Sequence, residues 1–233
     1  MIPKVIHYCW FGKNPLPILA QKCIESWKKY LPEYEIKEWN ESNFDVNCIP
    51  YVKEAYEAKK YAFVSDYARF WILYHYGGIY FDTDVEIIKS MDDILSKGSF
   101  MACEEPNPNN PPLYPPVAAG LGLAVNAHHE VCKKILMHYE HIHFKLIDGT
   151  YNQTTVVKVV TDILIELGLK NTSQIQKCHE IYIYPKDYFC PKSYYDKKIR
   201  ITSNTVAIHH FDGSWLSKKQ KIKMKIKKLL GLQ

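Results

Sequence analysis

The chain has 233 residues, 47% of them apolar and 14% aromatic, which is enough to bury a substantial core as one α/β domain. Its seven scattered cysteines include no C-x-x-C pair, which fits reduced thiols better than a disulfide framework or a zinc site. Seven lysines and no acidic residue fall in 217–233, so taking seven from the net charge of +5 leaves −2 for the remainder. A nearly neutral body argues against a nucleic-acid-binding domain.

Two strand–helix pairs open the chain. The apolar pattern and the breakers predict a strand, a helix, a second strand and a second helix over residues 3–11, 17–31, 34–39 and 51–60. Gly12 closes the first strand, and Pro17 stands where a first helical residue is expected, since its fixed φ suits that position.

The stretch 62–86 combines a helix with an acidic pair. Helical spacing through residue 76 puts Asp66 and Arg69 three apart, on one face, and Gly77-Gly78 ends the helix. A short apolar strand over 79–84 then follows. Its period of two predicts that Tyr80, Asp82 and Asp84 point the same way. Two carboxylates so placed repel one another unless a cation lies between them, and oxygen ligands favour Mg²⁺ or Mn²⁺.

Irregular structure and a histidine-rich helix follow. Residues 104–117 hold six prolines and cannot form regular structure, so they are expected to serve as a lid or acceptor loop, or as an ordered extended connector. Asn126 is expected to cap a helix that runs to about residue 143. That helix carries five histidines without H-E-x-x-H spacing, which favours a solvated polar face over a metal cluster.

The last third of the chain predicts an apolar helix over 154–167 and strands over 180–184 and 205–211. Asn152, Gln153 and Thr154 at the start of this helix either cap it or bind a sugar.

The alternation of strands and helices predicts an α/β fold, with a mostly parallel central sheet covered on both faces. Ligands of such sheets bind at the carboxyl ends of the strands, where Trp10 and the two aspartates fall. We expect one domain over 1–216, with a nucleotide half over 1–100 and an acceptor half over 101–216.

Four motifs occur in a fixed order along the chain. They are His7-x-x-Trp10-x-Gly12, Ser65-Asp66-x-x-Arg69, Gly77-Gly78-Ile79-Tyr80-x-Asp82-x-Asp84 and His209-x(4)-Ser214-Trp215. This set resembles the glycosyltransferases with a DXD sugar-binding region. That group includes yeast Golgi mannosyltransferases, α-1,4-galactosyltransferases, bacterial capsular-polysaccharide enzymes and, more distantly, the glucosylating clostridial toxins.

The resemblance implies a GT-A fold, a nucleotide-diphospho-sugar donor, a divalent ion (Mn²⁺ or Mg²⁺) and retention of anomeric configuration. It also implies a role for each matched residue. Trp10 would stack on the nucleobase, and Ser65 would reach the ribose. Asp66 and Arg69 would hold sugar hydroxyls. Tyr80 and Asp82 would line the nucleotide and the metal, and Asp84 would be the direct metal ligand. His209 would complete the metal shell, with His210 as the competing candidate. Ser214 and Trp215 would face the diphosphate.

The residue chemistry agrees with these roles and leaves alternatives. A cation on the leaving diphosphate would stabilise charge where it develops. Asp66 and Arg69 could instead merely pair with each other on a helix surface, Trp10 could be core filler, and His209 could be a satisfied core histidine.

The tail over 217–233 carries apolar residues at helical spacing with lysines between them. Such a segment suits an anionic membrane surface, at roughly 1 kcal/mol per lysine, or forms a solvated terminal helix. Neither a secretion signal after Met1 nor an apolar run of about 18 residues stands in the sequence, so we expect a cytoplasmic protein, peripheral at most to the plasma membrane.

The sequence therefore predicts a metal-dependent retaining hexosyltransferase that uses UDP, or alternatively GDP, sugars in the synthesis of bacterial surface polysaccharide. Its acceptor is expected to be a glycan or a lipid-linked saccharide. The alternatives are a haloacid-dehalogenase-type phosphatase, which wants Thr or Val where Glu86 stands, and a metal-dependent sugar-binding module without catalysis.

Overall fold

The computed structural model describes residues 2–213, so the predictions for Ser214, Trp215 and the basic tail lie outside the described residues. The helices are α1 (Ile18–Tyr30), α2 (Pro50–Glu57), α3 (Tyr61–Tyr76), α4 (Asp92–Leu95), α5 (Glu130–Glu140), α6 (Val156–Glu166) and α7 (Lys186–Phe189). The strands are β1 (Val5–Cys9), β2 (Glu35–Trp39), β3 (Gly78–Tyr80), β4 (Val85–Ile87), β5 (Phe100–Cys103), β6 (Val117–Val125), β7 (Gln176–Cys178), β8 (Ile181–Tyr184) and β9 (Ala207–His209).

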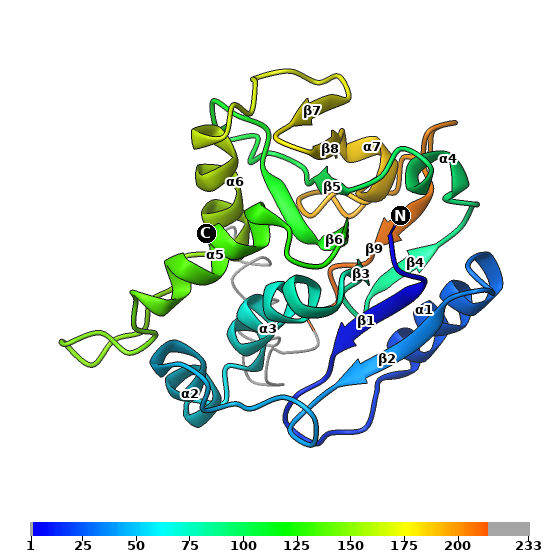
Figure 1. Ribbon diagram of the computed structural model, residues 1–233. Coiled ribbons are helices and arrows are strands. Elements are labelled where there is room, and N and C mark those ends of the chain that lie inside the picture. The colour runs from blue at the N-terminus through cyan, green and yellow to red at the C-terminus, as the bar shows by residue number, and fades with distance from the viewer. Residues whose placement is uncertain (1, 214–233) are drawn as a thin grey trace.

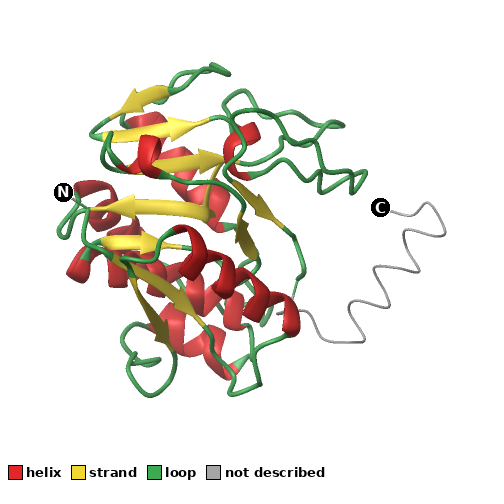
Figure 2. Ribbon diagram, turned by 90° about the vertical axis from the view of Figure 1, so that its right-hand side faces the viewer, coloured by secondary structure: helices red, strands yellow, loops and turns green. Residues whose placement is uncertain are grey.

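A seven-stranded mixed sheet runs in the order β2-β1-β3-β6-β5-β8-β7. The β2-β1, β1-β3 and β5-β8 pairs are parallel, whereas β3-β6, β6-β5 and β8-β7 are antiparallel. Because β6 alone reverses between β3 and β5, the carboxyl ends of β1, β2, β3, β5 and β8 share one edge with the amino end of β6. We call this edge the site edge. Figure 2 shows the strands stacked one above another, with long loops beyond one set of strand ends.

Helices cover both faces of the sheet. Figure 1 shows α2, α3, α5 and α6 on one side, and α1, α4, α7 and the small β4–β9 sheet on the other. Each face has its own cluster of fully buried apolar side chains, one beneath α3 and one beneath α1. This burial on both faces is the expected driving force for an α/β fold.

The fold class and most of the expected elements are confirmed, with local corrections. The capping prediction was wrong, because His129 rather than Asn126 caps α5 and accepts from the Val131 N–H through its ring. The strand expected over 79–84 ends at Tyr80. The prolines leave 104–116 without regular structure, as expected, and all seven cysteines are free. No helix within residues 2–213 is long and apolar enough to span a membrane.

His7 occupies the centre of β1 and ties three elements together. The Trp39 indole donates to His7 Nδ1 over 3.0 Å, so Nδ1 accepts and Nε2 carries the proton that is donated to Gly77 O, also at 3.0 Å. Burial lowers the pKa of His7 to about 4, with the Gly77 hydrogen bond opposing this shift. The histidine of the H-x-x-W-x-G motif therefore joins β1 to β2 and to the end of α3.

The neutral state of His7 predicts a loss of stability in acid. The unfolded chain protonates His7 near pH 6.5 and the folded chain only near pH 4. The stabilisation is therefore complete above pH 6.5 and is lost as the pH falls to about 4, at a cost of about 3 kcal/mol. Urea unfolding at pH 7 and pH 4 should show a smaller drop for His7→Gln than for wild type. The exposed His141→Gln serves as the control, and equal drops for wild type and His7→Gln would contradict this account.

Candidate active site

A buried arginine lies at the centre of the site. The guanidinium of Arg69, 4% exposed, contacts Asp66 Oδ1 at 2.9 Å and Asp82 Oδ1 at 3.3 Å through Nη2. Its Nε donates to Ser65 O over 3.1 Å, which holds the side chain along α3. Asp66 and Arg69 do pair, as the alternative interpretation expected, but they pair in the interior and share a third member from the β3 loop.

Tyr80 and Asp82 meet through a turn rather than along a strand. The chain leaves β3 at Tyr80, and Asp82 O accepts from Val85 N in a tight turn. The Tyr80 hydroxyl donates to Asp82 Oδ1 over 3.2 Å, and the Arg69 guanidinium lies 4.9 Å from the centre of the Tyr80 ring. The expected grouping of Tyr80 with Asp82 is therefore present, although the period-two argument for it was wrong.

Gly120 makes room for Asp82. Asp82 N donates to Gly120 O over 3.0 Å, and a Cβ added at Gly120 would lie 1.9 Å from Asp82 Oδ2. No side chain larger than hydrogen fits there unless Asp82 moves. Sequence reasoning missed Gly120, for which the one available signal was the run of small residues Ala118-Ala119-Gly120 within an apolar stretch.

Asp84 points elsewhere and meets the C-terminal histidines. Its Oδ1 lies 3.1 Å from His209 Nε2, and its Oδ2 accepts from Asp212 N over 2.8 Å. The antiparallel β4–β9 pair sets this contact, since Val85 is opposite His209. His210 Nε2 instead lies 2.8 Å from Glu86 Oε2. Of the two candidate histidines, His209 is therefore the one that the structure brings to Asp84.

Burial and pairing set the charges in this group. Burial by itself would raise the pKa of Asp84, but the charge and hydrogen bond of His209, together with backbone hydrogen bonds such as that from Asp212, lower this pKa to about 2. Burial opposes the charge on His209, while Asp84 raises the pKa of the imidazole. For Asp66, burial raises the pKa to about 7 against the pull of Arg69.

These residues fit a divalent cation whose coordination is completed by substrate phosphates and water as well as by protein side chains. Within residues 2–213 no three His, Cys, Asp or Glu side chains already gather into a shell. Mg²⁺ and Mn²⁺ commonly take one or two carboxylates and complete their shell with substrate phosphates and water. Asp84, with Asp82 in the same loop, offers carboxylates of this kind, and His209 would add one imidazole nitrogen. His209 Nδ1 is buried without a hydrogen-bond partner among the described residues, which marks a ring whose polar contacts are incomplete.

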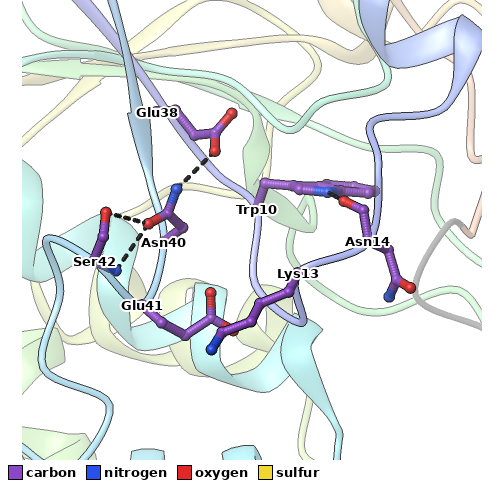
Figure 3. A pocket seen from close by; sticks show the side chains of 7 residues that line it. All are labelled: Trp10, Lys13, Asn14, Glu38, Asn40, Glu41 and Ser42. Carbon is purple, nitrogen blue, oxygen red and sulfur yellow. Dashed lines mark hydrogen bonds between the residues drawn. The ribbon is translucent and has the colours of Figure 1, made fainter.

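A cavity of about 430 Å³ opens beside Trp10. Figure 3 shows its wall of side chains, which are Trp10, Lys13, Asn14, Glu38, Asn40, Glu41 and Ser42. The Trp10 indole N–H donates to Asn14 O over 2.6 Å, so the ring is held as a flat wall with an open face. Trp10 is partly exposed and is not core filler.

The predicted site residues thus form groups along the site edge. Trp10 follows β1 and Asp82 follows β3, and these two strands are parallel neighbours. Ser65 uses its hydroxyl within α3, where it donates to Tyr61 O over 3.1 Å. Ser214 and Trp215 lie outside the described residues.

Comparison with known proteins gives a direct match to the acidic motif. Residues 17–101 match the family described as glycosyltransferase sugar-binding region containing DXD motif. This chain carries that DXD region. The matched segment includes Asp66, Arg69, Asp82 and Asp84, so the resemblance drawn from the motifs is confirmed.

Two similar curated proteins come from Schizosaccharomyces pombe. Inositol phosphoceramide mannosyltransferase 1 is 32% identical over 111 residues, which are 43% of this chain and 33% of the relative. Inositol phosphoceramide mannosyltransferase 3 is 35% identical over 102 residues, which are 40% of this chain and 27% of the relative. The similarity therefore spans a third or less of the length of these relatives.

The fold extends beyond that region. A glycosyltransferase involved in the glycosylation of the major capsid of PBCV-1 superposes with a TM-score of 0.54 at 12% identity, over 96% of this chain and all of the other. At that identity the likeness shows the fold alone. The DXD region is therefore carried on a GT-A fold, as expected.

Gly120→Ala tests how the DXD region is held. The added methyl should displace Asp82 and lower the free energy of unfolding by about 1–3 kcal/mol, the usual cost of overpacking. Removing the opposing carboxylate with Asp82→Ala should relieve most of that cost in the double variant, so the two effects should be non-additive. Urea unfolding of both single variants and the double variant gives the coupling, and additive losses would show that the two residues do not meet.

Proposed function

We propose that this protein is a metal-dependent retaining glycosyltransferase, which moves a hexosyl group from a nucleotide-diphospho-sugar to a glycan or lipid-linked acceptor. One observation carries the proposal: the Asp84–His209 pair and the Arg69–Asp82 pair lie on the same sheet edge as the cavity beside Trp10. That edge offers a flat wall for a base, ligands for a cation and a fixed positive group.

The described residues support separate roles in binding the nucleobase, the cation and the sugar. The open face of Trp10 suits stacking on a nucleobase, which contributes about 1–3 kcal/mol per base. Asp84 and His209 would hold the divalent ion, which when bound supplies Lewis-acid stabilisation for the departing nucleoside diphosphate. Asp66 and Asp82 keep carboxylate oxygens next to Arg69, where they can accept from sugar hydroxyls while the guanidinium balances their charge.

The donor and acceptor are proposed from the similarity of the chain to the curated relatives and not from a contact in the structure. The curated relatives are mannosyltransferases by name and act on inositol phosphoceramide by name, which supports a hexose donor and a lipid-linked acceptor for this chain. UDP and GDP sugars are both candidate donors. The resemblance of the motifs to bacterial capsular-polysaccharide enzymes supports a role for the proposed reaction in surface-polysaccharide synthesis.

A donor panel tests the reaction class. Purified protein with Mn²⁺ should slowly release nucleoside diphosphate from one of UDP-glucose, UDP-galactose or GDP-mannose, with the anomer of any transferred sugar retained. Asp84→Asn should lower this turnover by at least about 100-fold, since it removes a metal ligand and the partner of His209. Asp93→Asn, a change in an exposed acid on α4, should leave turnover unchanged.

Three outcomes would contradict the proposal. Undiminished turnover in Asp84→Asn removes the metal assignment. Release of inorganic phosphate points to the phosphatase alternative, which the GT-A fold already disfavours. Sugar binding without any release of nucleoside diphosphate points to a binding module.

The lysine-rich tail adds a prediction about location. Seven lysines without an acid in 217–233 should bind anionic vesicles electrostatically, so deleting 217–233 should abolish sedimentation with phosphatidylglycerol liposomes at low salt. Donor hydrolysis in solution should persist in the truncated protein. Equal sedimentation of the full-length and truncated proteins would contradict the membrane role.

A further inference from the structure

Two exposed tyrosines lie close to His209. Tyr194 and Tyr195 are 44% and 38% exposed, so each leaves a large part of its surface open to solvent. The Tyr194 ring contacts Phe211 at 5.5 Å between ring centres, and Phe211 contacts the His209 imidazole at 4.2 Å, both in a T-shaped arrangement. The Tyr194 and His209 rings are therefore no more than about 10 Å apart, which is the sum of these two separations.

The two tyrosines belong to an ordered loop, residues 192–199, which we call the tyrosine loop. The ends of this loop pair as an antiparallel bridge. Inside it, the buried hydroxyl of Ser193 accepts from the N–H groups of Tyr195 and Asp196, over 3.1 and 3.2 Å. The tyrosines are thus exposed on a backbone that its own hydrogen bonds hold, so a ligand that binds them pays little for ordering the loop.

Contacts from other elements fix the tyrosine loop to the site edge. Glu105, two residues beyond the end of β5, accepts from Tyr194 N over 3.2 Å. Lys192 donates through Nζ to His210 O over 2.6 Å, directly after β9. The loop is therefore attached both to the end of β5 and to the segment that carries His209.

The backbone of Phe211 is strained. Its φ of 52° lies in the left-handed region, which aromatic residues rarely adopt. Such a conformation costs about 1–3 kcal/mol and persists only where the surrounding structure demands it. Here it accompanies the contact of one ring with both His209 and Tyr194. The connection between the proposed metal residue and the tyrosine loop is therefore a maintained feature of the fold.

The position of the tyrosine loop on the site edge indicates which substrate it meets. Trp10 follows β1 and Glu105 follows β5, and these strands are three strand spacings apart, or about 14 Å. A donor with its base on Trp10 and its diphosphate at Asp84 and His209 occupies the part of the edge nearer to β1. The second substrate is then expected to reach the donor sugar from the side of β5, where the tyrosine loop lies.

Exposed tyrosine rings suit a sugar ring. A pyranose carries C–H groups on its faces and hydroxyls around its rim, and the negative face of an aromatic ring attracts such C–H groups. Tyrosine also offers a large contact area at a low cost in side-chain entropy. Nζ of Lys197 already lies 4.1 Å from the centre of the Tyr194 ring. The surface that remains for a sugar is therefore the rest of Tyr194 together with Tyr195.

We propose that Tyr194 and Tyr195 form an acceptor subsite, which binds a pyranose ring of the acceptor saccharide by contact with its C–H face. The inference rests on the proposed glycosyltransferase function and adds the residues that hold the second substrate. The loop lies within 101–216, the part of the chain for which an acceptor role is expected.

Transfer to simple sugars tests the subsite. The probes are the methyl α- and β-pyranosides of glucose, galactose and mannose, with Mn²⁺ and the donor that the protein hydrolyses fastest. The wild type should transfer sugar to at least one of them. Tyr194→Ala with Tyr195→Ala should raise the KM for that probe by about tenfold or more, since a tenfold change corresponds to about 1.4 kcal/mol of ring contact. The kcat at saturating probe, and donor hydrolysis without probe, should stay within about twofold of wild type.

Two control variants separate the ring contact from other effects. Tyr194→Phe with Tyr195→Phe keeps both rings and should stay within about threefold of the wild-type KM. Tyr76→Ala removes a tyrosine that is 47% exposed at the end of α3, and it should change neither the KM nor donor hydrolysis.

A spectroscopic readout detects binding without turnover. In protein labelled with 3-fluorotyrosine, the single variants Tyr194→Phe and Tyr195→Phe assign the two ¹⁹F resonances. These resonances should shift when the same methyl pyranosides are added to the wild type with Mg²⁺ and nucleoside diphosphate, and the Tyr76 resonance should not.

The outcomes separate the subsite from the proposed function. If the wild type hydrolyses a donor but the pyranosides neither accept sugar nor shift the two resonances, the subsite is wrong while the function stands. The subsite is also wrong if the double alanine variant keeps the wild-type KM, or if the double phenylalanine variant loses as much as the double alanine variant. If the wild type releases nucleoside diphosphate from no donor, the proposed function fails, and the acceptor role fails with it.

Discussion

The ion cluster of Arg69 with Asp66 and Asp82 is the interaction on which the site depends. A guanidinium 4% exposed must be balanced, and removing one partner of a buried pair typically costs 3–5 kcal/mol because the other charge is left alone. Since Asp66 belongs to α3 and Asp82 to the loop after β3, the cluster fixes the helix against the loop. Gly120 on β6 completes this arrangement, because its missing side chain leaves space for the Asp82 carboxylate.

The two aspartates of the D-x-D motif consequently have different surroundings. The turn that joins Asp82 to Val85 sends Asp82 toward Arg69 and Asp84 toward His209. Asp82 is therefore tied to a permanent cation, whereas Asp84 is paired with an imidazole, which can give up its proton and accept a metal instead. The separation avoids the mutual repulsion that a shared strand face would impose, and it is consistent with the proposed roles of one acid toward the sugar and the other toward the cation.

Local patterns predicted the elements of the first hundred residues well, because each signal there was short-range. Periodicity and glycine placement located α3 and β3, and the order of motifs located Asp66, Arg69 and Asp84. The signals failed where partners are distant in sequence. Gly120 and the choice between His209 and His210 depend on how β6 and β9 pair with other strands, and no local pattern carries that information. Asn126 does not cap α5 for a different reason. The helix begins later, at Glu130, and the ring of His129 makes the capping contact.

The reversed direction of β6 explains why the proline-rich segment borders the site. β5 ends and β6 begins at the site edge, so the chain that joins them, 104–116, must leave and return at that edge. In an all-parallel sheet this connection would have crossed to the opposite edge behind a helix, and no residue after β5 would be tied to one before β6. The bond between Glu104 N and Pro116 O closes the base of this loop. The topology therefore places this irregular connector at the site edge.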